Sequence, residues 1–241
     1  MLQCIALTDK NTNLKKCIIL QEFSLKKIQI SLDAMGGDDA PRVVIEGASE
    51  AKTRYPDISY IFYGNKNKLL PILNSHKNLL GSECIHTKTY VKANDKPSNI
   101  IRKGGNTSMA LSIKAVKEGK ADAVVSAGNT GALMAFSKLF LRTMPGINRP
   151  AIAACFPTQT GEVCMLDLGA NLECDKNNLI QFAMMGQAFA KIVMGVKDPK
   201  VSLLNVGEEE IKGLVHIKEA SDLLFKLRKI INYNGYIEGD K

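Results

Sequence analysis

The sequence predicts an α/β fold in which a mixed, mostly parallel sheet carries a series of glycine-bearing loops. Four short apolar runs typical of strands each end in glycine with Asn, Asp or Ser nearby, and a helical pattern follows each of them. These runs begin at Ile28, Ala123, Val163 and Val201. In a parallel α/β sheet such loops emerge together at the carboxyl ends of the strands, which is where ligands bind.

The individual elements follow from the same patterns. Strands are expected near 28–32, 59–63, 84–87, 124–125, 151–156, 163–166 and 201–204, with another beginning at 236. Helices are expected near 41–54, 66–74, 108–118, 131–141, 176–194 and 215–231. The short turn 157–161 joins two strand-like runs as a hairpin, so the sheet is expected to be mixed.

The chain has 241 residues, 45% of them hydrophobic, which suits one large α/β domain or two small ones sharing a sheet. Residues 1–27 are polar and weakly patterned, and we interpret them as an N-terminal extension for which disorder is one option. We expect the organised α/β domain to span residues 28–241.

Composition excludes several classes of function. The net charge of +8 favours an acidic protein partner or an anionic membrane surface, whereas no nucleic-acid recognition motif accompanies it. No run of about 18 apolar residues and no secretory signal appears, so a cytoplasmic location is expected. The six cysteines form no C-x-x-C pair and are expected to be reduced and mostly buried.

The loop after the second of these runs, Ser126–Gly131, has the properties of an anion site. Gly128 and Gly131 let main-chain N–H groups approach a ligand, and Asn129 or Thr130 can cap the following helix. The positive end of that helix would face the loop, which suits phosphate. A tight strand-to-helix connection that binds nothing is the alternative.

Standard cofactor and nucleophile motifs are absent from the sequence. There is no G-x-G-x-x-G, no nucleotide P-loop, no G-x-S-x-G and no metal-ligand spacing, so neither a cofactor nor a metal is expected. The polar groups left near the loops are three carboxylates and three cations: Asp33, Asp38, Asp167, Arg102, Lys103 and Lys176. Such a site suits phosphate as the nucleophile, since phosphate is largely dianionic near neutral pH and a thiolate leaves readily.

Four motifs together resemble the phosphate acyltransferases of bacterial phospholipid synthesis, the PlsX family. They are L-D-A-M-G-G-D at 32–38, G-K-A-D-A-V-V-S-A-G-N-T-G-A-L-M-A at 119–135, L-D-L-G-A-N at 166–171 and L-L-N-V-G-E-E at 203–209. The resemblance runs from Ile28 to Lys241. Family members usually begin near Ile28 and continue beyond the last residue here, including an Asp-Gly-Phe-x-Gly-Asn loop, so a leader and a missing C-terminal part are expected.

The resemblance implies an enzyme that converts acyl-[acyl-carrier-protein] and inorganic phosphate to acyl phosphate and free carrier protein. It also implies a three-layer α/β/α fold similar to phosphotransacetylases and to isocitrate and isopropylmalate dehydrogenases. A homodimer is expected, located in the cytoplasm and in peripheral contact with the inner face of the cell membrane. There a membrane glycerol-3-phosphate acyltransferase would receive the product, and the acidic carrier protein suits the positive net charge.

By position, the resemblance assigns residues to the site. Within these loops we expect Asn129, Thr130 and Asn171 to orient phosphate, and Lys176 or main-chain N–H groups to stabilise the thioester oxyanion. The expected substrate-binding residues are Asp33, Gly36, Gly37, Asp38, Ser126, Gly128, Thr130, Gly131, Asp167, Gly169, Asn205, Gly207 and Glu208. Two alternatives remain: an inactive remnant that binds carrier protein or sister subunits, and a related phosphotransacetylase-like enzyme using a coenzyme A thioester.

Overall fold

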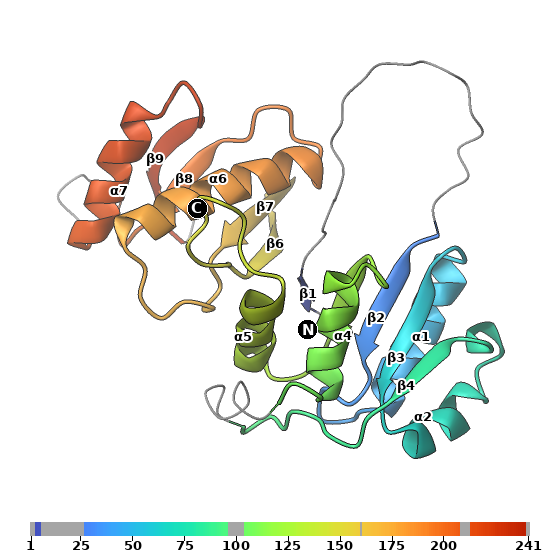
Figure 1. Cartoon of the computed structure of the whole chain (residues 1–241). Coiled ribbons are helices and arrows are strands. Elements are labelled where there is room, and N and C mark those ends of the chain that lie inside the picture. The colour runs from blue at the N-terminus through green and yellow to red at the C-terminus, as the bar shows by residue number, and fades with distance from the viewer. Residues whose placement is uncertain (1–2, 6–26, 96–103, 160, 208–212, 240–241) are drawn as a thin grey trace, which may run out of the picture. The chain divides into compact units, whose positions relative to one another are not determined.

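The computed structural model describes residues 3–5, 27–95, 104–159, 161–207 and 213–239. These residues form two compact units, Met1–Arg142 and Thr143–Lys241. The division is finer than the single α/β domain expected from residue 28 onward. Figure 1 shows the elements of each unit.

The first unit is built on a five-stranded sheet with the order β1-β5-β2-β3-β4. Its strands are β1 (Gln3–Ile5), β2 (Gln29–Asp33), β3 (Ser59–Gly64), β4 (Glu83–His86) and β5 (Ala123–Ser126). β2, β3, β4 and β5 run parallel, whereas β1 pairs antiparallel with β5 at one edge. The sheet is therefore mixed because of β1, and not because of the hairpin at 157–161, from which a mixed sheet was predicted and which forms a sheet of its own. No strand was predicted before residue 28.

Helices cover both faces of this sheet (Figure 1). They are α1 (Arg42–Arg54), α2 (Lys66–Leu73), the 3₁₀ turn η1 (Lys77–Leu79), α4 (Ser108–Lys117) and α5 (Thr130–Phe140). On one face Phe62 packs with Ile45 of α1 and Leu69 of α2. On the other face Val124 packs with residues of α4 and α5. Because alternate side chains of a strand point to opposite faces, the sheet supports two cores and the unit has three layers.

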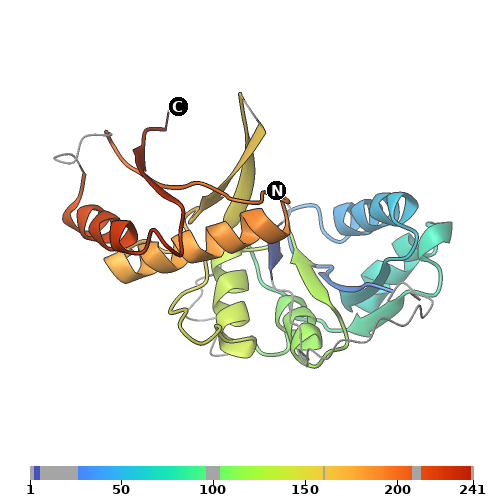
Figure 2. The same ribbon diagram turned by 90° about the horizontal axis from the view of Figure 1, so that it is seen from above.

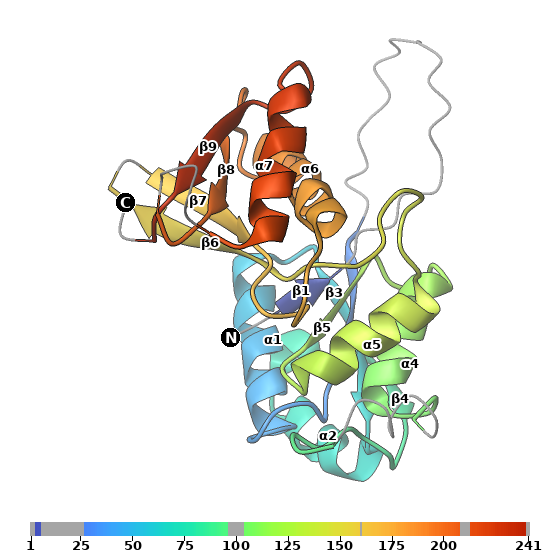
Figure 3. The ribbon, with the colours of Figure 1, turned by 90° about the vertical axis from the view of Figure 1, so that its left-hand side faces the viewer.

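The second unit contains two smaller sheets. β6 (Ala153–Thr158) and β7 (Gly161–Leu166) form the expected hairpin, drawn in gold in Figure 2. β8 (Val201–Leu204) and β9 (Tyr233–Ile237) pair in parallel beside α7 (Val215–Lys226), as Figure 3 shows. The long helix α6 (Lys176–Ile192) contacts β7, β8 and α7, and its Ala183 joins Leu203, Ala220 and Leu224 in a small core.

Two expectations need correction. Among the described strands, β7 and β8 pair in sheets of two and not with β2 and β5, because β6 and β9 supply their ladder partners. Cys155, expected to be buried, is exposed because the β6–β7 ribbon leaves most of its side chains in contact with solvent. Within the described ranges, no helix is long and apolar enough to cross a membrane.

Candidate functional site

The loops that follow β2 and β5 meet at one end of the five-stranded sheet. A Cβ atom added to Gly36 would lie 3.0 Å from the main-chain N of Gly128 and 2.5 Å from Asp33 Oδ2. A Cβ atom added to Gly128 would lie 3.2 Å from Gly36 Cα. Only residues without a Cβ allow the two backbones to approach this closely. The predicted convergence of these two loops is confirmed.

A buried hydrogen-bond chain holds the two loops together. Ser126 Oγ at the end of β5 donates to Asp33 Oδ2 at the end of β2 over 2.7 Å. The same hydroxyl accepts the Gly128 N–H at 3.1 Å. Asp33 is 1% exposed and Ser126 is 3% exposed. These two side chains, predicted to bind substrate, hold the two loops together through these hydrogen bonds.

Burial gives Asp33 unusual electrostatics. Loss of hydration raises the pKa of this carboxyl above its usual value, and hydrogen bonding from Ser108, Ser126 and the Met35 N–H offsets part of the rise. The carboxyl therefore carries less negative charge than an exposed aspartate would at the same pH.

The start of α4 lies against the same carboxyl. Thr107 caps the helix by accepting the Ala110 N–H at 3.3 Å. The next residue, Ser108, is fully buried, and its hydroxyl lies close enough to Asp33 to lower the pKa of that carboxyl, although the two groups do not meet the geometry of a regular hydrogen bond. Its proximity to Asp33 places the N-terminus of α4 beside the β2 loop.

Asn129 is the N-cap residue of α5, and both polar atoms of its side-chain amide form hydrogen bonds. Its Oδ1 accepts the Ala132 N–H at 2.9 Å, and its Nδ2 donates to the Ala93 carbonyl at 2.7 Å. The predicted helix cap is confirmed, and the tether to Ala93 was not foreseen, because sequence spacing gives no sign of it. Toward other described residues, the N–H groups of Thr130 and Gly131 make no hydrogen bond, as expected of a first helical turn.

In the second unit, the loop after β7 is organised by Asp167. Its Oδ1 accepts the N–H groups of Ile152 and Ala170, and its Oδ2 accepts the N–H and Nδ2 of Asn171. Asn171 Nδ2 also donates to the Pro150 carbonyl at 2.9 Å. Asp167 was predicted to bind substrate and Asn171 to orient phosphate. Both side chains hold the segment Asp167–Asn171 in shape, with Gly169 exposed at the bend.

The other predicted residues of this unit are also engaged internally. Asn205 follows β8, is 8% exposed and donates from Nδ2 to the Gly207 carbonyl at 2.9 Å. Lys176 opens α6, where its Nζ lies 3.1 Å from Glu219 Oε2 of α7 in an exposed ion pair. The expected role of Lys176 at an oxyanion therefore requires that this ion pair open.

The remaining predictions fall at the surface or outside the described ranges. Gly37 and Asp38 are exposed in the loop after β2. Glu208, Arg102 and Lys103 lie outside the described residues. Within the part of the chain that the structure describes, no group of three His, Cys, Asp or Glu side chains could hold a metal ion.

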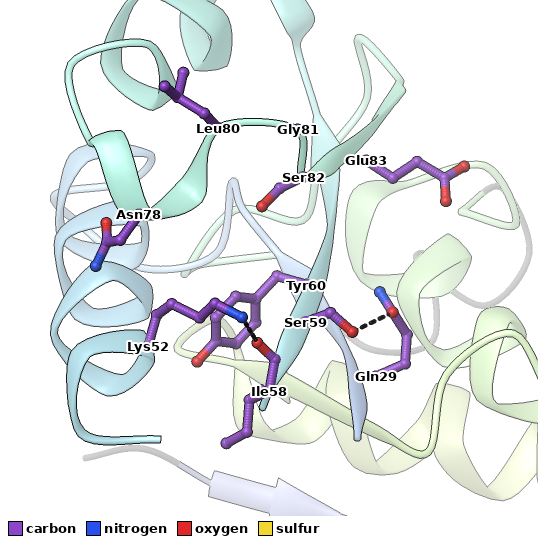
Figure 4. A pocket seen from close by; sticks show the side chains of 10 residues that line it. All are labelled: Gln29, Lys52, Ile58, Ser59, Tyr60, Asn78, Leu80, Gly81, Ser82 and Glu83. Carbon is purple, nitrogen blue, oxygen red and sulfur yellow. Dashed lines mark hydrogen bonds between the residues drawn. The ribbon is translucent and has the colours of Figure 1, made fainter. Parts of the chain in front are cut away.

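A depression of about 270 Å³ lies at the opposite end of the same sheet. Figure 4 shows its lining, which comes from the beginnings of β2 and β3, the end of α1 and the segment before β4. Lys52 Nζ donates to the Ile58 carbonyl there, and Ser59 Oγ donates to Gln29 Oε1 at 2.6 Å. We place the candidate site instead at the glycine loops, where the N–H groups of Thr130 and Gly131 make no hydrogen bond to other described residues and the start of a helix favours an anion.

A sequence profile of the family described as "Fatty acid synthesis protein" matches residues 28–241. The chain belongs to this family. The match covers all four glycine-bearing loops, including those of the second unit. The recognition of the family from its motifs is therefore confirmed.

Curated relatives carry a more specific name. A protein of Parvibaculum lavamentivorans named "Phosphate acyltransferase" is 50% identical over 215 residues, which is 88% of this chain and 60% of that protein. A protein of Rhodospirillum centenum with the same name is 50% identical over 212 residues, again 88% and 60%. The chain thus spans about 60% of the length of these relatives.

A solved structure shares the fold. The EutD phosphotransacetylase from Staphylococcus aureus superposes with a TM-score of 0.63 at 20% sequence identity, covering 88% of this chain and 69% of that one. This similarity confirms the predicted α/β fold class and its likeness to phosphotransacetylases.

Proposed function

We propose that this chain forms acyl phosphate from acyl-[acyl-carrier-protein] and inorganic phosphate, in the synthesis of fatty acids and phospholipids. Its family membership and the name of its relatives support this assignment. The structural observation that carries it is the meeting of the β2 and β5 loops beside the start of α5. That arrangement offers main-chain N–H groups to an anion without any cofactor.

Phosphate would bind at the N-terminus of α5. The N–H groups of Thr130 and Gly131 are free toward the described residues, and the helix dipole favours negative charge at this point. Asn129 would act by holding the helix start in place, because its own polar atoms already bond to Ala132 and Ala93. Asn171 would shape the loop of the second unit in the same way.

The reaction needs positioning more than a strong base. A phosphate oxygen would attack the thioester carbonyl carbon, and the resulting oxyanion would collapse with cleavage of the C–S bond and release of the carrier thiolate. Phosphate is already largely dianionic near neutral pH, and a thiol pKa of about 8.5 makes a good leaving group. Main-chain N–H groups would stabilise the oxyanion, with Lys176 available once it leaves Glu219.

The proposed partners follow from charge and family. The net charge of +8 would attract an acidic carrier protein by long-range electrostatics. We include in the proposal a homodimer in the cytoplasm, with peripheral contact at the inner face of the membrane. The acyl phosphate would pass there to a membrane glycerol-3-phosphate acyltransferase.

The direct test is product formation by the purified chain. It is incubated with phosphate and either palmitoyl carrier protein or palmitoyl coenzyme A, and acyl phosphate is trapped with hydroxylamine. The proposal expects product from the carrier thioester. Product from coenzyme A alone favours a phosphotransacetylase-like enzyme, and a folded chain that forms no product contradicts the proposal.

A charge placed in the α5 cap tests the phosphate position. Asn129→Asp keeps an oxygen that can cap the helix, removes the Nδ2 donor to the Ala93 carbonyl and adds negative charge beside Thr130 and Gly131. We expect the phosphate concentration for half-maximal effect, in thermal shift and in turnover, to rise about tenfold or more, equivalent to about 1.4 kcal/mol. Asn65→Asp is the matched control, since Asn65 caps α2 through the Asn67 N–H, away from the loops. Equal behaviour of the two variants would reject this phosphate position.

A further inference from the structure

The β6–β7 ribbon carries two cysteines directly opposite each other. Cys155 of β6 pairs with Cys164 of β7 in an antiparallel register that continues on both sides. Side chains directly opposite in such a pair lie on the same face of the ribbon. The hairpin therefore holds two thiols together that are separated by eight residues in the sequence.

The position in the ladder suits a covalent bond between them. Antiparallel pairs alternate between hydrogen-bonded and non-hydrogen-bonded types, and Pro157, two residues beyond Cys155, has no N–H to donate. Cys155 thus shares with Pro157 the non-hydrogen-bonded type, in which Cα atoms lie about 4.5 Å apart. That separation is within the range of about 4.4–6.8 Å that a disulfide requires.

The two thiols differ in accessibility. Cys155 is exposed, whereas Cys164 is half-buried. Burial, followed by the proximity of the Cys155 thiol, raises the pKa of Cys164 to about 11. Cys164 is therefore protonated near neutral pH, and Cys155 is the thiol that a reagent in solution meets first.

We propose that Cys155 and Cys164 form a site of reversible oxidation by small disulfides of the glutathione type. The Cys155 thiolate attacks one sulfur of the small disulfide, forming a mixed disulfide and releasing one thiolate. Cys164 then gives its proton to solvent and attacks the Cys155 sulfur, which releases the second thiolate. The pair loses two electrons and two protons, and the small disulfide is reduced to two thiols.

This bond would tie the ribbon close to the loop that Asp167 organises. Two residues along the ribbon, Ala153 and Leu166 form the next non-hydrogen-bonded pair. Leu166 directly precedes Asp167, whose Oδ1 accepts the N–H of Ile152, the residue before Ala153. A disulfide between Cys155 and Cys164 would therefore link β6 to β7, the two strands next to this loop. The site is separate from the β2 and β5 loops, and the proposal does not depend on the phosphate chemistry.

The experiment maps the bond in the full chain. The chain is equilibrated with mixtures of reduced and oxidised glutathione, the remaining thiols are alkylated, and the protein is cleaved after glutamate. Cleavage at Glu162 separates the two cysteines, and cleavage at Glu173 separates Cys174 from both. We expect mass spectrometry to find one linked pair of peptides, containing Cys155 and Cys164, that a reductant releases.

Controls distinguish a folded dithiol from chance pairing. Cys174→Ser should retain the linked peptides, whereas Cys155→Ser and Cys164→Ser should each abolish them. In urea the equilibrium constant for closure should fall about tenfold or more, because the register no longer holds the thiols together. A native chain that yields only glutathione adducts, links Cys174 instead, or closes equally well in urea would overturn the proposal.

Discussion

The loops after β5 and β7 share a sequence pattern but meet different surroundings. In each, an Asn donates from Nδ2 to a main-chain carbonyl of an earlier connection, Asn129 to Ala93 and Asn171 to Pro150. The carboxylates that organise the two regions differ. Asp33 is almost fully buried and its pKa is raised, whereas Asp167 is half-buried and accepts four hydrogen bonds.

The difference comes from the sheets that carry the loops. β2 and β5 are neighbours in a five-stranded sheet covered on both faces, so their loops are pressed together and their polar groups must bond to each other. Among the described strands β7 pairs with β6 alone, and the described hydrogen bonds of its loop centre on the Asp167 carboxylate. The same motif thus supports close packing in one unit and a local turn in the other.

The largest loss of stability is expected from a substitution that disrupts the close packing of the loops in the first unit. Gly36→Ala would place a Cβ 2.5 Å from Asp33 Oδ2 and 2.9 Å from Ser126 Oγ. We expect the free energy of unfolding to fall by about 3 kcal/mol, measured by urea denaturation. Gly47→Ala in α1 is the control: nothing lies within 4 Å of its new Cβ, and it should stabilise by up to about 1 kcal/mol. Equal effects would show that the loops are not tightly packed.

A smaller effect is expected from the half-buried carboxylate of the second unit. Asp167→Ala removes the acceptor of the Ile152, Ala170 and Asn171 N–H groups. Because water can replace part of this bonding, we expect a loss of about 2 kcal/mol in urea denaturation. Asp198→Ala, which removes one exposed hydrogen bond from Asn232, should cost no more than about 0.5 kcal/mol. A loss at Asp167 as small as this control would contradict the organising role.

Replacing Asp33 is expected to change the free energy of unfolding least at neutral pH. It should, however, change how that free energy depends on pH. Folding raises its pKa above the usual 3.8, so the folded state binds the proton more tightly. Its contribution to stability is full below pH 3.8 and is lost as pH rises through the folded pKa. Asp33→Asn should flatten this decline by about 1.4 kcal/mol for each unit of pKa shift. Urea midpoints measured from pH 4 upward test this, with exposed Asp38→Asn as control, and an unchanged slope is the contrary result.

Most of the secondary structure follows from local pattern. The helices predicted near 66–74, 108–118 and 131–141 appear as α2, α4 and α5, because cap residues and apolar periodicity act within one turn. The hairpin predicted at 157–161 is also present, formed by β6 and β7. The pairing of strands in the sheets could not be predicted. β7 hydrogen-bonds to β6 and not to β2 or β5, and the sequence of a single strand does not indicate which other strand it will pair with.

The sequence by itself determined the family, the glycine-bearing loops and the caps of the helices, because these depend on residue type and short spacing. Tertiary structure alone decided what each polar side chain does. Asp33, Ser126, Asn129 and Asp167 were predicted to contact substrate, and their partners come from distant segments that bury or tether them. A side chain's role depends on which acceptors and donors folding brings within about 3 Å, and that distance is set by packing.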